Sequence, residues 1–145
     1  MTLTLLALQL LSTLFMTGVI WFVQIVHYPL MRHVPREAFQ EYEHHHQRAT
    51  TWVVAPAMLV ELFTAIGLVV VLEYAAVRTV AAANLALAVG IWLSTFLGQM
   101  PIHQRLAQEY QAGLIDRLVR TNWVRSGLWG VRSVLVLWIT YNVTE

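Results

Sequence analysis

The uncharged stretch LTLLALQLLSTLFMTGVIWFVQIV, from Leu3 to Val26, decides the fold. Its only strongly polar residues are Gln9 and Gln24, and it exceeds the roughly 20 apolar residues with which an α-helix crosses a bilayer. A cleavable signal peptide begins with basic residues and has a shorter apolar run, whereas this chain begins MTLTLL. The stretch therefore predicts a retained transmembrane helix over residues 3–27. We expect Pro29 to end that helix, because proline disfavours helical geometry in the residue before it.

Three more apolar runs follow, over residues 52–73, 79–99 and 122–141. The chain is 58% hydrophobic and 12% charged, whereas soluble domains average roughly 45–50% apolar and about 25% charged residues. Its 145 residues fit one domain. The sequence thus predicts a single transmembrane domain over residues 1–145. Its expected fold is all-α, a four-helix antiparallel bundle with a polar helical segment between the first two spans.

The arginines predict the orientation in the membrane. All nine basic residues are Arg, and the side of the bundle that carries the loop between spans two and three holds Arg78 alone. Cytoplasmic loops are enriched in basic residues. The sequence therefore predicts cytoplasmic loops after spans one and three and both termini outside, in the inner or plasma membrane if the chain is bacterial. Those two loops hold Arg32, Arg36, Arg48, Arg105, Arg117 and Arg120.

The predicted partners are the lipid bilayer and a small molecule. A net charge of +1 gives no basis for binding nucleic acid. The third span is rich in small residues, as in AAANLALAVG from Ala81 to Gly90, and small residues let membrane helices approach closely. Such packing suits the interior of one bundle and the interface of a homo-oligomer equally, so both remain open.

Two charges lie inside the predicted spans. Glu61 follows Trp52 by nine residues and Arg132 follows Asn122 by ten, which places both roughly 14 Å deep at about 1.5 Å per residue. Charged residues at that depth usually pair and face the bundle interior. We therefore predict that Glu61 and Arg132 are partners. A purely structural ion pair and a functional pair, in which Arg132 anchors substrate and Glu61 carries a proton, both remain open.

Further polar residues gather at the loop side of the predicted bundle. The fourth span has a polar stripe whose members lie within about 80° on one helix face, and His27 and His103 each follow an apolar run at the same membrane face. We expect these residues to line one cavity. The predicted catalytic residues are His27, His103, Glu61 and Arg132, and the predicted substrate-binding residues are Gln24, Gln99, Asn122, Arg125 and Trp129.

The polar segment EYEHHHQR carries three of the six histidines. Glu41 and His44 have the i, i+3 spacing of helical metal ligands, so we predict a metal site at Glu41, His44 and His45. Cysteine is absent, and the remaining His and carboxylate ligands suit a transition metal such as Fe, Cu or Zn. A site without a cofactor is the alternative, because consecutive histidines on a helix point in different directions. We expect His46 to lie on another face.

Three short motifs resemble the anthrone-oxygenase-like family of small four-helix membrane proteins. They are HYPL from His27 to Leu30, QMPIHQRL from Gln99 to Leu106, and NWVRSGLW from Asn122 to Trp129. The resemblance implies oxygenation of polycyclic phenolic substrates without a classical cofactor. This chain departs from the family pattern in having His103 where many members have Asn, and in its histidine triplet, and both departures favour a metal.

The sequence therefore predicts a membrane-embedded oxidoreductase, an oxygenase acting on a small hydrophobic or phenolic substrate at a His-, Arg- and Glu-lined cytoplasmic-side pocket. Histidine is the natural acid–base group near neutral pH, and arginine suits an anionic or phenolate oxygen. Two other classes remain open. One is a small membrane transporter or binding protein for a hydrophobic or anionic ligand, and the other is a structural subunit that docks another protein.

Overall fold

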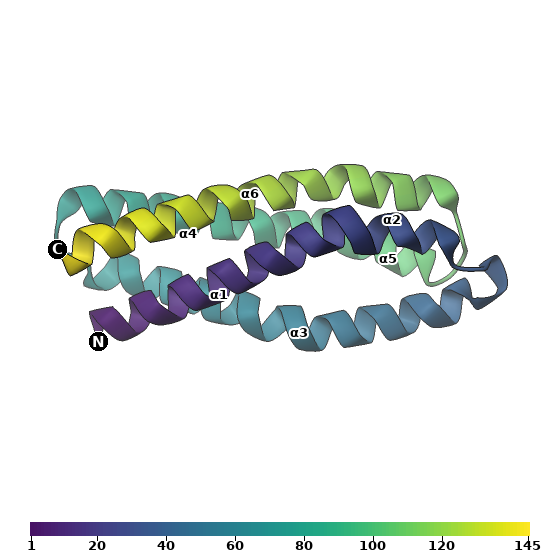
Figure 1. Ribbon diagram of the computed structural model, residues 1–145, viewed down its shortest axis with the longest axis horizontal. Helices are drawn as coiled ribbons and strands as arrows, with labels where there is room; N and C mark the ends of the chain where they lie inside the picture. The colour runs from purple at the N-terminus through teal and green to yellow at the C-terminus, as the bar shows by residue number, and fades with distance from the viewer.

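The computed structural model describes all 145 residues and contains helices but no strands. Four helical rods run along one long axis (Figure 1). Rod 1 spans Thr2–His33 and consists of α1 (Thr2–Phe22), the π-helical turn η1 (Val23–His27), α2 (Tyr28–Leu30) and the 3₁₀ turn η2 (Met31–His33). Rod 2 is α3 (Arg36–Val71), and rod 4 is α6 (Ala112–Thr144). Rod 3 spans Ala75–Leu106 and consists of α4 (Ala75–Ser94), the π-helical turn η3 (Thr95–Gln99) and α5 (Met100–Leu106).

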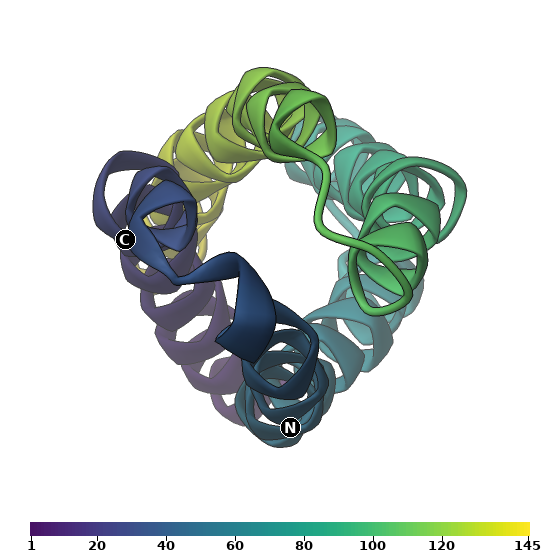
Figure 2. The ribbon, with the colours of Figure 1, turned by 90° about the vertical axis from the view of Figure 1, so that its right-hand side faces the viewer.

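Both termini lie at one end of the long axis, together with the link between α3 and α4 (Figure 1). We call this the terminal end. The links between η2 and α3 and between α5 and α6 lie at the opposite end, which we call the loop end. The view along the axis shows the four rods around a common centre (Figure 2). Each rod contacts two neighbours, in the ring order α1, α3, α4, α6.

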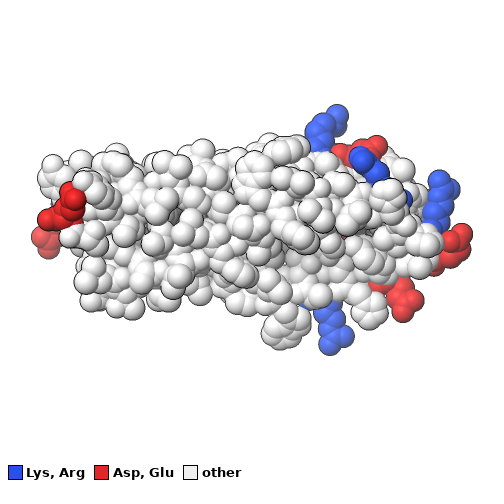
Figure 3. Space-filling model, viewed as in Figure 1, with Lys and Arg blue, Asp and Glu red and all other residues white.

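Three of the rods, Thr2–His33, Arg36–Val71 and Ala75–Leu106, are long and apolar enough to cross a membrane. The fourth predicted span is part of α6, which is not among the three because polar residues interrupt its apolar sequence. Its arginines Arg125 and Arg132 are nevertheless only 5% and 1% exposed. Charged side chains gather at the two ends of the molecule and leave most of its length white in Figure 3.

The prediction that Pro29 ends the first helix is wrong, because the helix continues to His33. Proline lacks an N–H, and its ring crowds the carbonyl four residues earlier. Here a wider π turn precedes the proline, and the Tyr28 N–H bonds to the carbonyl of Val23, five residues back. The same arrangement precedes Pro101 in rod 3. Both rods therefore extend past their prolines and carry polar side chains toward the loop end.

The polar segment that we expected between the first two spans is not a separate helix. It forms the first turns of α3, which runs without a break over its 36 residues and is about 54 Å long at 1.5 Å per residue. Gly113 lies in the first turn of α6. The continuity of α3 matters for the site, because it fixes which polar residues share a face with Glu61.

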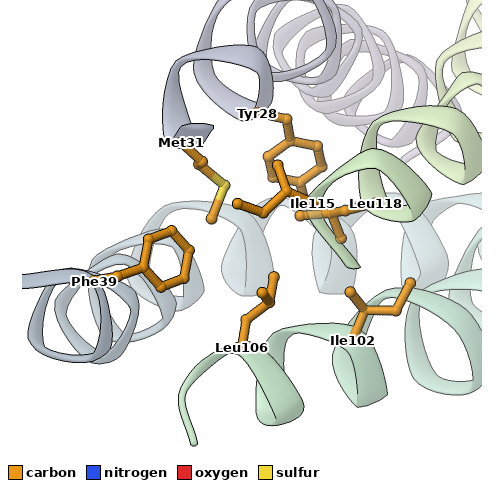
Figure 4. Packing of buried hydrophobic residues seen from close by; sticks show 7 residues of the cluster. All are labelled: Tyr28, Met31, Phe39, Ile102, Leu106, Ile115 and Leu118. Atoms are coloured by element: carbon orange, nitrogen blue, oxygen red, sulfur yellow. The ribbon is translucent and has the colours of Figure 1, made fainter. Parts of the chain in front are cut away.

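Apolar side chains close the bundle at both ends and in the middle. The loop-end cluster (Figure 4) consists of Tyr28, Met31, Phe39, Ile102, Leu106, Ile115 and Leu118. The terminal-end cluster consists of Leu6, Leu68, Leu72, Val77, Ala81 and Ile139. The middle cluster consists of Met16, Ile20, Met58, Ile91 and Trp129. Buried polar residues fill the two levels between these clusters.

Candidate functional site

Buried polar side chains form two groups inside the bundle. The first, which we call the loop-end site, surrounds His103 of α5. The second, which we call the mid-bundle network, surrounds Glu61 of α3. The loop-end site lies at a pocket that neither Glu61 nor Arg132 lines.

Three side chains from three rods form a chain of contacts at the loop-end site. His103 Nδ1 lies 2.6 Å from Glu43 Oε1, and His103 Nε2 lies 3.0 Å from the Tyr28 hydroxyl. Glu43 is completely buried. An ionised carboxylate only accepts hydrogen bonds, so His103 donates from Nδ1 and accepts the Tyr28 proton at Nε2. With this assignment His103 is a base at Nε2, and the buried Glu43 carboxylate orients its ring through Nδ1.

Gln47, one turn after Glu43 on α3, fixes this arrangement. Its Nε2 donates to Glu43 Oε1 at 3.1 Å and to the backbone carbonyl of His103 at 2.9 Å. One amide therefore ties the carboxylate and the histidine to each other across two rods. Such contacts hold the ring in one orientation, which general-base catalysis requires.

A second histidine pair lies beside the first. His27 Nε2 and His46 Nδ1 are 2.9 Å apart, and their rings stack with centroids 4.5 Å apart. The Thr50 hydroxyl lies 3.1 Å from the same His46 nitrogen. His46 belongs to the polar start of α3, ahead of the apolar stretch that begins at Trp52. Burial, and then the nearby His103 and His27, lowers the pKa of His46 to about 3, so this ring stays neutral at physiological pH.

Arg125 of α6 reaches the site from the bundle centre. Its Nη1 donates to Asn122 Oδ1 at 3.0 Å, and its guanidinium carbon lies 5.2 Å from the centre of the Trp129 ring. Asn122 in turn donates to Gln24 Oε1 at 2.9 Å, and Gln24 donates to the backbone carbonyl of Val119 at 3.1 Å. These contacts hold a buried cation in a fixed place.

A pocket of about 340 Å³ lies between α3 and the α4–η3–α5 rod. Its polar wall contains Tyr28, His46, Gln47, Gln99, His103 and Arg125. The pocket therefore meets an oriented histidine, a tyrosine hydroxyl and a buried arginine at once. A small molecule held there has an acid–base group and a cation within reach.

The mid-bundle network contains the predicted ion pair. Arg132 Nη1 lies 2.8 Å from Glu61 Oε1 and both side chains are at most 2% exposed, so the predicted pairing is confirmed. Trp129 Nε1 donates to both Glu61 oxygens at 3.2 and 3.1 Å, and Arg132 Nε donates to Asn84 Oδ1 at 3.1 Å. Neither Glu61 nor Arg132 lines the pocket. Trp129 links the two groups, because it contacts Glu61 by its nitrogen and Arg125 by its ring.

The structure thus brings half of the twelve predicted site residues together at the loop end. Gln99, His103 and Arg125 line the pocket. His27 and Asn122 contact its wall through His46 and Arg125, and Gln24 contacts Asn122. Glu61 and Arg132 lie deeper and contact the site only through Trp129.

The predicted metal ligands do not fit a metal centre. Glu41, His44 and His45 are all exposed, and the only contact among them joins His45 Nε2 to Glu41 Oε1 at 3.9 Å. In the whole chain no three His, Asp or Glu side chains are arranged to hold a metal ion. These three side chains therefore lie on the outer face of α3, away from the loop-end pocket.

The residues that sequence reasoning missed are Tyr28, Glu43, His46 and Gln47. The pattern in the sequence that could have found those on α3 is the helical spacing that places them on the same face as Glu61. Counting back from Glu61 in steps of three or four residues, through Met58 and Val54, leads to Gln47 and Glu43. The signal is lost when the polar segment is treated as a helix of its own.

The sequence matches no protein-family model, no curated protein and no solved structure. The resemblance to anthrone-oxygenase-like proteins therefore rests on its three short motifs. Residues of all three motifs, among them Tyr28, His103 and Arg125, lie at the pocket.

Proposed function

We propose that the protein is a membrane-embedded oxidoreductase, an oxygenase that acts on a small hydrophobic or phenolic substrate in the loop-end pocket. The observation that carries the proposal is the Glu43–His103–Tyr28 contact chain, whose His103 and Tyr28 line the pocket together with Arg125. A carboxylate that orients a histidine, which in turn faces a hydroxyl, is the arrangement that catalytic bases use in unrelated folds. The apolar remainder of the pocket suits an aromatic ring.

The proposed reaction oxidises an activated CH₂ group beside a phenolic ring with dioxygen. The substrate passes a proton to the Tyr28 oxygen while Tyr28 passes its own proton to His103 Nε2, and Glu43 stabilises the resulting imidazolium. Arg125 stabilises the substrate anion. The carbanion forms a C–O bond to dioxygen, and the peroxide takes the proton back from His103. Loss of the second C–H proton with cleavage of the O–O bond gives a ketone and water, so one dioxygen is consumed for each substrate.

The proposed setting of this site is a bilayer that all four rods cross as antiparallel spans. Three rods have the length and composition to cross, and α6 turns its two span arginines inward. Polar groups within a membrane must be satisfied inside the protein. We place the loop end in the cytoplasm, following the arginine distribution.

A test of the activity is dioxygen uptake by the purified protein in lipid nanodiscs with anthrone as substrate. We expect uptake to fall by about 10²–10⁴-fold in His103→Gln, the range that a positioned acid–base group contributes. His45→Gln is the matched control, because His45 is an exposed histidine on the outer face of α3. A thermal unfolding curve of each variant separates loss of the base from loss of the fold. Equal uptake by wild type and folded His103→Gln contradicts the proposal.

The enzyme is favoured over a transporter by the shape of the interior. A transporter needs a polar path to both sides of the membrane. Here the terminal-end cluster, which includes Leu6, Leu72 and Ile139, fills the end of the bundle opposite the pocket with apolar side chains. The polar interior therefore does not continue through the terminal end of the bundle.

A further inference from the structure

The wall of the loop-end pocket changes character along the bundle axis. At the loop end it is polar, with His46, His103 and Arg125. About three turns further toward the terminal end, it is apolar, with Met58 of α3 and Trp92 of α4. The residue spacing, 46 to 58 on α3, corresponds to about 18 Å at 1.5 Å per residue. The pocket is thus a slot with a polar and an apolar end.

The slot opens sideways, on the outer surface of the bundle. Phe96 and Met100 line it and are themselves 51% and 41% exposed. Neither side chain is charged. In a bilayer, this opening faces lipid chains.

The slot is too small for a large hydrophobic molecule. Its volume of about 340 Å³ lies at the low end of the roughly 300–1,000 Å³ of small-molecule pockets. It accommodates a ring system of the size of anthrone and the first carbons of a chain. A longer chain leaves through the lateral opening and lies among the lipids.

The charges at the polar end favour a neutral head that can ionise during a reaction. Buried Glu43 and buried Arg125 carry opposite charges within the site. A carboxylate head would add an uncompensated negative charge near Glu43, and buried unpaired charges are costly. A hydroxyl both accepts from an arginine and donates to a histidine or carboxylate chain.

We propose that the natural ligand of this slot is a membrane-dissolved amphiphile with a hydroxyaryl head and an apolar tail, which enters sideways from the bilayer. The head lies against His46, His103 and Arg125, and the tail leaves between α3 and α4. The proposal rests on the proposed function in that the head carries the group to be oxidised. It adds to that function the apolar tail of the ligand and the entry of the ligand sideways from the bilayer.

The test uses two radiolabelled phenols as probes, which share one head and differ in the tail. One is 4-decylphenol, and the other is 4-methylphenol. Binding is measured in nanodiscs per mole of lipid, and nanodiscs without the protein give the background from partition into the bilayer. Ala55→Phe narrows the apolar end of the slot, and Leu59→Phe adds the same ring at an exposed position on the same helix.

We expect Ala55→Phe to weaken binding of the decyl probe at least tenfold and to change binding of the methyl probe less than twofold. Leu59→Phe should leave both unchanged. Equal weakening of both probes, or no effect on either, overturns the proposal, as does displacement of the decyl probe by 11-bromoundecanoic acid at equal concentration. The two proposals fail separately: binding as expected without dioxygen uptake by any phenol removes the oxygenase and leaves the amphiphile site.

Discussion

Glu61 and Arg132 are at most 2% exposed, and each is the other's main partner. Removing one member of a buried pair leaves an uncompensated charge, whereas replacing both with apolar residues of similar size is often neutral. Sequence reasoning found this pair because a charge at membrane depth is rare and needs a partner. Trp129 and Asn84 complete the shell of hydrogen bonds around the pair.

We predict that Glu61→Leu alone destabilises the protein by about 3–5 kcal/mol, since it leaves the buried Arg132 guanidinium without a counter-ion. The double variant Glu61→Leu/Arg132→Met should recover most of that loss. Thermal unfolding of the wild type, both single variants and the double variant in detergent forms a double-mutant cycle, which gives the coupling free energy between Glu61 and Arg132. Additive losses in the two single variants would show that the pair contributes nothing as a pair.

The lowered pKa of His46 makes the stability of the folded protein depend on pH. Its pKa in the folded protein is lowered to about 3 by burial and by His103 and His27, while the unfolded value is near 6.5. Between these values the unfolded chain binds more protons at this position than the folded one. Stability therefore falls as pH is lowered from about 6.5 toward 3.

We expect the unfolding temperature of the wild type to drop between pH 7 and pH 4.5, and His46→Gln to show a smaller drop. Glutamine keeps a polar group toward Thr50 and His27 but does not titrate. His44→Gln is the control, because it removes an exposed neighbour on the same turn. An identical pH profile for wild type and His46→Gln would show that His46 does not set the dependence.

The continuity of α3 explains which parts of the site were predictable from the sequence. The four apolar runs, the inward face of the fourth and the buried ion pair follow from hydropathy and helical spacing, both of which are local. The inward face of the polar segment does not, because it depends on whether residues 36–48 continue the helix of the following span. A break of even one residue shifts the phase by about 100°. The structure has no break there, so Glu43 rather than Glu41 faces inward.

The two prolines show a second limit. We expected Pro29 to end the first helix, because proline usually ends or kinks a helix, and Pro101 holds the corresponding place in rod 3. In each case a π turn before the proline keeps the rod continuous. Such turns have no sequence signature that hydropathy detects, yet here they precede Tyr28 and His103, two members of the contact chain.

Cysteine labelling tests the phase of α3, since the natural chain has no cysteine. We predict fast maleimide labelling of Glu41→Cys and His45→Cys, whose native side chains are 83% and 77% exposed. Glu43→Cys should react at least tenfold more slowly, because position 43 is completely buried. Rates are compared with that of the same variant unfolded in denaturant. Fast labelling at position 43 in a protein of native stability would place that face outside.

The whole molecule has an unequal distribution of polar groups along its axis. The loop end carries most of the charged surface (Figure 3) and the pocket, while the terminal end is closed by apolar side chains. Between them the polar interior continues from Arg125 through Trp129 to Glu61, which does not line the loop-end pocket. An interior that is polar at one end suits chemistry on a membrane-dissolved substrate better than passage across the membrane.

This asymmetry predicts the orientation in the membrane. Six of the nine arginines lie at the loop end, two are buried in α6, and Arg78 alone lies at the terminal end. Because basic residues are retained on the cytoplasmic side, we expect a reporter fused after Glu145 to be active only if it functions outside the cytoplasm. A matched fusion carries the same reporter between Gln108 and Glu109, in the link between α5 and α6, and should show the opposite result. If the reporter after Glu145 is found in the cytoplasm, the orientation is the opposite of the one predicted, and the pocket lies on the outer side. The lateral route to the pocket would survive that inversion, because it depends on the bilayer and not on which side is cytoplasmic.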